Sequence, residues 1–263
     1  MKNTIAAWSL QILMSMLWTV TETNGQNVPD KMDLYLLIGQ SNMAGRGQTD
    51  EASNPKSPHI WAINRQNEWK MAADPLHSDK PAVVGVGPGL TFAQTILAKN
   101  PDRTIGLIPC AVGGSAIDDW QPGAKHGQTG IYAYDEMLER VKEAQKHGTI
   151  KGIIWHQGES DSSLEKKDAY ARKLEAFFER LRKDTHTKNV PLVIGTIGDF
   201  YVAAHADAAT INQIITDYAK THKNTALASA SGLTHKGDDT HFDTKSAREL
   251  GKRYAEAIFS MSE

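Results

Sequence analysis

Short apolar runs alternate with amphipathic segments along most of this chain. Five runs are almost continuously apolar and are bounded by glycine or polar residues: 33–39, 104–110, 151–156, 190–197 and 224–230. Strands covered on both faces have this pattern, because neither of their faces meets water. The pattern therefore predicts five strands of a mainly parallel sheet.

The segments between these runs have the period of an α-helix. Apolar residues recur at three- and four-residue spacing in 131–146 and 164–185, and further helices are predicted at 89–99, 204–222 and 244–261. Asp243 precedes the last of them and is a suitable N-cap. This alternation predicts an α/β fold, a three-layer α/β/α sandwich around a five-stranded sheet. Right-handed connections then bring every strand's carboxyl end to one edge, where open α/β folds place their active sites.

Two segments depart from this alternation. Residues 44–88 are rich in Pro, Asn and Trp without strong periodicity, and we expect a long loop that forms a wall of the active-site cleft. Residues 1–25 hold Lys2 ahead of an apolar stretch and then small and polar residues, which predicts a signal peptide and export to the periplasm or medium. An uncleaved membrane-anchoring helix is the alternative. Residues 26–263 are predicted to form a single domain.

Charge and cysteine content narrow the classes of function. The 29 Lys and Arg residues nearly balance the 31 Asp and Glu residues, for a net charge of −2 without a dense basic tract. Nucleic acid is therefore not expected as a partner. No apolar stretch beyond the leader reaches the length of a membrane span. The only cysteine is Cys110, so an intrachain disulfide is impossible, and a lone cysteine after an apolar run is most often a small buried hydrophobe.

The first candidate for chemistry is Ser41. It follows the apolar run 33–39 by two residues and precedes a glycine-rich turn, which is how α/β enzymes present a serine nucleophile. The pattern is not the G-x-S-x-G elbow of α/β-hydrolases, because position 43 is Met. The alternative for Ser41 is a helix N-cap without chemistry.

The base that a serine nucleophile needs is predicted to be His241. It lies between the last strand and the last helix, at the same edge as Ser41, and Asp238 precedes it by three residues. In one turn that carboxylate can bond the imidazole Nδ1–H and leave Nε2 free for the Ser41 proton. Asp239 would point away at its spacing. His235 is a rival base without a carboxylate at that spacing.

Acyl transfer also requires donors for the oxyanion. The candidates are the backbone N–H of Ser41, the backbone N–H of Gly114 and the side-chain amide of Gln157. Gly114 could instead belong to a simple tight turn. Two neighbours of Gln157 are interpreted as structural residues: Glu159 could be a buried hydrogen-bonding partner, and His156 is more typical of a structural histidine than of a catalyst.

Three further residues are candidates for substrate contact. Trp120 follows the glycine pair and could stack on a sugar ring, although a tryptophan packed in the loop's core is an equal alternative. Gln40 and Arg46 flank the Ser41 turn. For Arg46, contact with a substrate and a solvated surface position remain open.

Taken together, these motifs carry a resemblance. The chain resembles the SGNH-hydrolase superfamily, and within it carbohydrate esterase family 6 and the sialate O-acetylesterase domain. The matching segments are Gly39-Gln40-Ser41-Asn42-Met43, Gly113-Gly114-Ser115, His156-Gln157-Gly158-Glu159-Ser160-Asp161 and Asp238-Asp239-Thr240-His241-Phe242. Gln157 stands where the wider superfamily usually has an asparagine donor.

The resemblance implies a flavodoxin-like fold and deacetylation of sugar hydroxyls by a Ser–His–acid mechanism without a metal or other cofactor. The implied substrate is an acetylated oligo- or polysaccharide, of the xylan or the sialic-acid type, and Glu159 is implied as a supporting acid beside Asp238. Two alternatives stay open. One is a non-catalytic carbohydrate-binding protein on the same fold, and the other is a short-chain esterase with a different leaving group.

Overall fold

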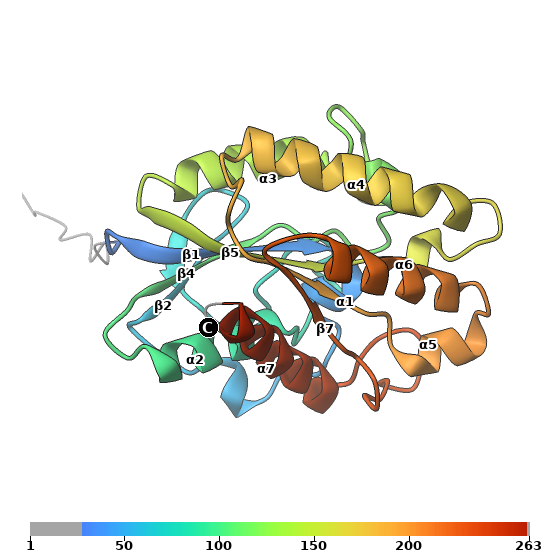
Figure 1. The fold of residues 1–263 in the computed structure, drawn as a ribbon. Coiled ribbons are helices and arrows are strands. Elements are labelled where there is room, and N and C mark those ends of the chain that lie inside the picture. The colour runs from blue at the N-terminus through green and yellow to red at the C-terminus, as the bar shows by residue number, and fades with distance from the viewer. Residues whose placement is uncertain (1–27, 262–263) are drawn as a thin grey trace, which may run out of the picture.

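The computed structural model describes residues 28–261, so the predicted leader lies outside the described residues. Seven strands form one sheet in the order β3-β2-β4-β1-β5-β6-β7 (Figure 1). The strands are β1 (Met32–Gly39), β2 (Ile60–Ile63), β3 (Trp69–Met71), β4 (Ile105–Pro109), β5 (Gly148–His156), β6 (Leu192–Gly195) and β7 (Thr225–Ala228). All neighbours pair in parallel except β2 and β3, which pair antiparallel.

The central strand β1 shows why the apolar runs are continuous. Leu34 and Leu36 are buried in one apolar cluster, whereas Tyr35 and Leu37, which alternate with them, are buried in another on the opposite face. The first cluster includes residues of α3 (Ala133–Ala144), α4 (Lys167–Asp184) and α6 (Ala208–Thr221). The second includes residues of α2 (Gly89–Lys99) and α7 (Thr244–Ser260). Figure 1 shows α3 and α4 above the sheet and α2 and α7 below it, which confirms the α/β/α sandwich.

The five predicted strands are present, but the predicted strand number is wrong. Segment 44–88 is not a plain loop, because β2 and β3 form a hairpin within it that extends the sheet beyond β4. Strand β2 has four residues and β3 has three, and an apolar pattern is not informative over such short segments. In β3, Lys70 separates Trp69 from Met71, as is common in an exposed edge strand.

The predicted helices are present with small changes. The predicted helix 204–222 begins at Ala208, and a separate short helix, α5 (Asp199–Ala204), precedes it. Asp243 caps α7 as expected, since its side chain accepts the backbone N–H of Ser246 at 2.7 Å. The remaining helical turns are α1 (Ser41–Ala44), η1 (Glu51–Ser53), η2 (Ile117–Trp120) and η3 (Glu159–Asp161). Within residues 28–261, no helix is long and apolar enough to cross a membrane.

Candidate active site

The Ser41 turn begins where β1 ends, and its shape depends on Gly39. This glycine has a φ of +130°, and a Cβ atom at this position would lie 2.0 Å from the carbonyl oxygen of His156 on the neighbouring strand β5. Only glycine fits such an approach. The chain therefore leaves β1 in a tight turn, and Ser41 starts α1 at the carboxyl edge of the sheet.

The Ser41 hydroxyl lies within hydrogen-bond distance of His241. Its Oγ is 3.0 Å from Nε2, and Nδ1 of the same ring is 2.8 Å from Oδ2 of Asp238. A carboxylate only accepts, so Nδ1 carries the hydrogen and Nε2 is the acceptor for the hydroxyl of Ser41. The structure thus brings Ser41 together with a histidine 200 positions away and the carboxylate three residues before that histidine, in the order that activation of a serine requires.

The Asp238 carboxylate stays ionised because of its partners. Partial burial favours the neutral acid, but hydrogen bonds from the His241 ring, from the backbone N–H groups of His241 and Thr240, and from Lys236 outweigh it and hold the pKa of Asp238 well below its ordinary value. Asp238 can therefore orient the imidazole and stabilise its protonated form over the whole neutral range.

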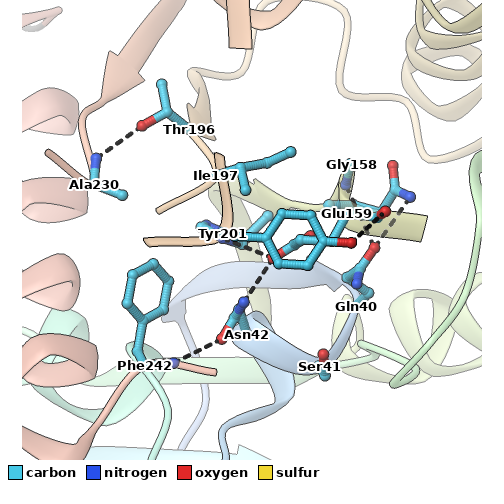
Figure 2. A network of polar contacts seen from close by, with 12 residues as sticks. Gln40, Ser41, Asn42, Gly158, Glu159, Thr196, Ile197, Tyr201, Ala230 and Phe242 are labelled. Carbon is cyan, nitrogen blue, oxygen red and sulfur yellow. Dashed lines mark hydrogen bonds and ion pairs between the residues drawn. The ribbon is translucent and has the colours of Figure 1, made fainter. Parts of the chain in front are cut away.

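The loop 229–243, which carries Asp238 and His241, is anchored along its length. At the start of the loop, the backbone N–H of Ala230 donates to Oγ1 of Thr196 at 2.8 Å, and Thr196 is the residue that follows β6 (Figure 2). A short antiparallel bridge pairs His235 with Phe242, and Asp243 caps α7 at the end of the loop. These anchors support the position of His241 relative to the Ser41 turn.

Asn42 joins this loop to the Ser41 turn. Its Nδ2 donates to the backbone carbonyl of Thr240 at 3.0 Å, and its Oδ1 accepts the backbone N–H of Phe242 at 3.1 Å, so it holds the residues on both sides of His241. Figure 2 shows Asn42 between Phe242 and Glu159. Asn42 is the site residue that sequence reasoning missed, and its only signal was a polar residue directly after Ser41.

Glu159 contacts Asn42 rather than His241. Its Oε1 accepts the Asn42 amide at 2.6 Å and lies 3.7 Å from Nε2 of the buried His156. Burial favours the neutral acid, but the neighbouring imidazole of His156 and the hydrogen bond from Asn42 outweigh it and place the pKa of Glu159 below its usual value. Among the described residues, no hydrogen bond or ion pair joins Glu159 to His241. Glu159 therefore reaches the His241 loop through Asn42 rather than by a contact of its own, and its role as a supporting acid stays a prediction.

His156 is a structural residue in this arrangement, in agreement with the sequence reading. Its ring is fully buried, and Nδ1 lies 2.7 Å from the hydroxyl of Tyr254 on α7. A side chain in place of Gly195 would have no room here, since a Cβ atom would lie 1.9 Å from that hydroxyl. The contact ties the end of β5 to α7 behind the candidate site.

An open pocket of about 410 Å³ lies in front of Ser41. Ser41 and His241 line it together with Gly114, which follows β4 and has a φ of +85°. Within residues 28–261, the backbone N–H groups of Ser41 and Gly114 make no hydrogen bond to the protein. Both N–H groups are therefore unpaired donors at the pocket, and their role in binding an oxyanion stays a prediction.

Gln157, the third expected oxyanion donor, lies behind the pocket instead. Its side chain is fully buried; its Nε2 donates to Asp161 Oδ2 at 2.5 Å and lies 3.2 Å from the carbonyl of Ser115, while its Oε1 accepts the Tyr170 hydroxyl at 3.0 Å. The amide is thus taken up by internal partners. Gln157 is therefore corrected from oxyanion donor to a residue that supports the turn after β5.

Arg46 is neither solvated nor free. Its side chain is buried and pairs with Asp79, with Nη2 at 2.9 Å from Oδ2. The same carboxylate oxygen accepts the backbone N–H of Gly113 at 2.7 Å. A Cβ atom on Gly113 would lie 2.1 Å from the Arg46 guanidinium, which explains the glycine. Arg46 still lines the pocket, and Asp79 links it to the loop that carries Gly114.

Comparisons with known proteins identify the family of this chain. The profile of the family described as "Carbohydrate esterase, sialic acid-specific acetylesterase" matches residues 31–260. The chain belongs to this family. A "probable carbohydrate esterase" of Arabidopsis thaliana is 30% identical over 249 residues, which cover 86% of this chain and 90% of the plant protein. The protein is accordingly an esterase.

Solved structures show the same fold. The crystal structure of an Arabidopsis thaliana protein superposes with a TM-score of 0.77 at 28% identity and covers 88% of this chain and 98% of its own. NanS follows with a TM-score of 0.70 at 19% identity, covering 89% and 98% of the two chains. A carbohydrate acetylesterase from Xanthomonas citri has a TM-score of 0.67 at 21% identity, covering 87% of this chain and 56% of its own.

In this esterase, Trp120 does not have the exposed position that stacking on a sugar ring requires. The Trp120 side chain is fully buried, its Nε1 donates to Ser115 Oγ at 3.1 Å, and its ring packs edge-on against Trp155 and Phe177. The prediction that it contacts substrate is wrong, because η2 turns the indole into the core between the sheet and α4. The aromatic residue that lines the pocket is Tyr201 of α5.

Gln40 lines the pocket, and its predicted contact with substrate stays a prediction. Its side-chain oxygen, however, faces the turn after β5 and accepts the backbone N–H groups of Gly158 at 3.4 Å and Ser160 at 3.3 Å (Figure 2). Within the part of the chain that the structure describes, no partner is present for its Nε2. Gln40 therefore braces the turn through its oxygen and leaves its amide hydrogens at the pocket wall.

Within the described residues, no group of three or more His, Cys, Asp or Glu side chains is arranged to hold a metal ion.

Proposed function

We propose that the protein is a serine O-acetylesterase that removes acetyl groups from the sugar hydroxyls of acetylated glycans. The observation that carries this proposal is the chain of contacts from Ser41 through His241 to Asp238, located at an open pocket. The family to which the chain belongs supports a carbohydrate substrate. Glycans of the xylan type and of the sialic-acid type both fit the proposal.

In the proposed reaction, His241 takes the proton of Ser41 as its Oγ attacks the acetyl carbonyl carbon. The N–H groups of Ser41 and Gly114 bind the oxyanion that forms. His241 then gives its proton to the departing sugar hydroxyl, which leaves an acetyl group on Ser41. Water, deprotonated by His241, attacks this ester in the same way and releases acetate. Asp238 holds the imidazole in the required tautomer throughout.

The lining of the pocket supports a short acyl group and a hydroxylated leaving group. Nearly all lining residues are polar or glycine, and the apolar or aromatic contributions come from Val83 and Tyr201. A long acyl chain would therefore find few apolar side chains to pack against. Sugar hydroxyls would meet donors and acceptors instead. The apolar leader of residues 1–25 supports the further proposal that the enzyme is exported.

The test is acetate release from acetylated xylan and O-acetylated sialic acid, measured beside hydrolysis of p-nitrophenyl acetate, butyrate and octanoate. We expect activity on the acetates that falls steeply with acyl length. Ser41→Ala should abolish it, whereas Ser163→Ala, which changes an exposed serine outside the pocket lining, should not. Equal hydrolysis of octanoate, or full activity of Ser41→Ala, would contradict the proposal.

A further inference from the structure

A lysine contacts the carboxylate of the Ser–His–Asp arrangement and has no part in the proposed chemistry. Lys236 Nζ lies 3.1 Å from Asp238 Oδ2, the same oxygen that lies 2.8 Å from His241 Nδ1. One carboxylate oxygen therefore faces an ammonium group and an imidazole N–H together.

The position of Lys236 is fixed by the backbone as well. Its N–H donates to the carbonyl of His241 at 2.9 Å, beside the bridge that pairs His235 with Phe242. Lys236 also lines the pocket. The backbone of Lys236 is thus fixed next to His241, and its partly exposed side chain places the ammonium group at Asp238 from there.

The other charged groups around His241 are engaged elsewhere. On the same loop, His235 pairs with Asp239, with Nε2 at 3.2 Å from Oδ1. On the elements that face the pocket, Arg46 pairs with Asp79, Lys80 donates to Gln128, and Glu159 accepts from Asn42. Tyr201 of α5 donates its hydroxyl to the carbonyl of Glu159. Among the described residues, Lys236 is the cationic side chain other than His241 that contacts Asp238.

We propose that Lys236 is a positioning residue that extends the activity of this esterase to lower pH by opposing protonation of His241 through their shared carboxylate oxygen. The proposal rests on the proposed function. A positive charge at Asp238 offsets part of the negative charge that would stabilise an imidazolium ion. A neutral residue in place of Lys236 lets His241 keep its proton to higher pH, and a protonated His241 cannot accept the proton of Ser41.

The experiment is the pH dependence of kcat/KM for p-nitrophenyl acetate, which carries no charge and so removes substrate steering. Lys236→Met keeps the aliphatic stem and should move the acid limb upward by about half a pH unit, because a partly exposed ion pair is screened by water. Lys236→Arg keeps the charge and should leave the limb in place. Lys80→Met is the matched control, since it removes another lysine that lines the pocket without a contact to Asp238.

Added salt gives a second readout, since screening should shrink the difference between Lys236→Met and the unmodified protein. An unmoved acid limb in Lys236→Met would overturn the proposal, as would an equal shift in Lys80→Met. A higher KM with an unmoved limb would instead make Lys236 a substrate contact and also overturn it. Failure of the proposed function would be distinct, because Ser41→Ala would then keep the activity of the unmodified protein.

Discussion

Replacing His241 by alanine is expected to lower kcat/KM for acetate esters by about 10⁶-fold, the order of loss that follows removal of the base from a serine triad. Without the imidazole, the Ser41 hydroxyl must give its proton to water, and the residual rate comes from binding and the oxyanion donors alone. The acid limb of the pH profile should disappear together with the activity, because no histidine remains at Ser41 to be protonated. Steady-state kinetics across the pH range measures both effects.

His59→Ala is a suitable control for this loss. His59 is exposed and does not line the pocket, so its removal should leave kcat/KM unchanged. Asp238→Asn should also cost about 10⁴-fold, because a neutral amide no longer selects the imidazole tautomer with its hydrogen on Nδ1. A His241→Ala protein that keeps a tenth or more of the activity would rule out His241 as the base.

The second large effect is expected at Asn42. Asn42→Ala removes the contacts to the Thr240 carbonyl and the Phe242 N–H on both sides of His241. A shift of about 1 Å in a catalytic group lowers rates by about 10²-fold, so we expect kcat to fall by that order with little change in KM. Single-turnover and steady-state kinetics separate the two parameters, and thermal unfolding shows whether the variant is folded.

A double variant distinguishes the two roles considered for Glu159. If Glu159 acts through Asn42, Glu159→Ala should lower kcat, but adding it to Asn42→Ala should have little further effect. If Glu159 assisted His241 directly, the two losses would multiply. Multiplicative losses would therefore contradict the arrangement in which Asn42 stands between Glu159 and the histidine loop.

Much of this architecture could be predicted because it depends on patterns of several residues. The continuous apolar runs identified the central strands, and the order of strands and helices placed Ser41, Gly114 and His241 at one edge of the sheet. The Asp238–His241 spacing was informative for the same reason, since three residues in one turn bring the two side chains together. In each case a pattern in the sequence determines where the residues lie relative to one another.

The remaining features depend on side-chain orientation, which spacing does not determine. Trp120 and Gln157 occupy the predicted loop and strand end, but the core takes the indole of Trp120, and Asp161 and Tyr170 take the amide of Gln157. Asn42 acts through contacts almost 200 positions away in the chain, which no local pattern reveals. The hairpin of β2 and β3 was missed because its strands are too short to show a period.

The most direct test of the account is covalent labelling of the esterase with a fluorophosphonate, which reacts with activated serine hydroxyls. Peptide mass spectrometry should place the label on Ser41, in proportion to the loss of acetate release, and Ser41→Ala and His241→Ala should remain unlabelled. A label on another residue that abolishes activity, or full activity with Ser41 completely labelled, would contradict the assignment of Ser41 as the nucleophile.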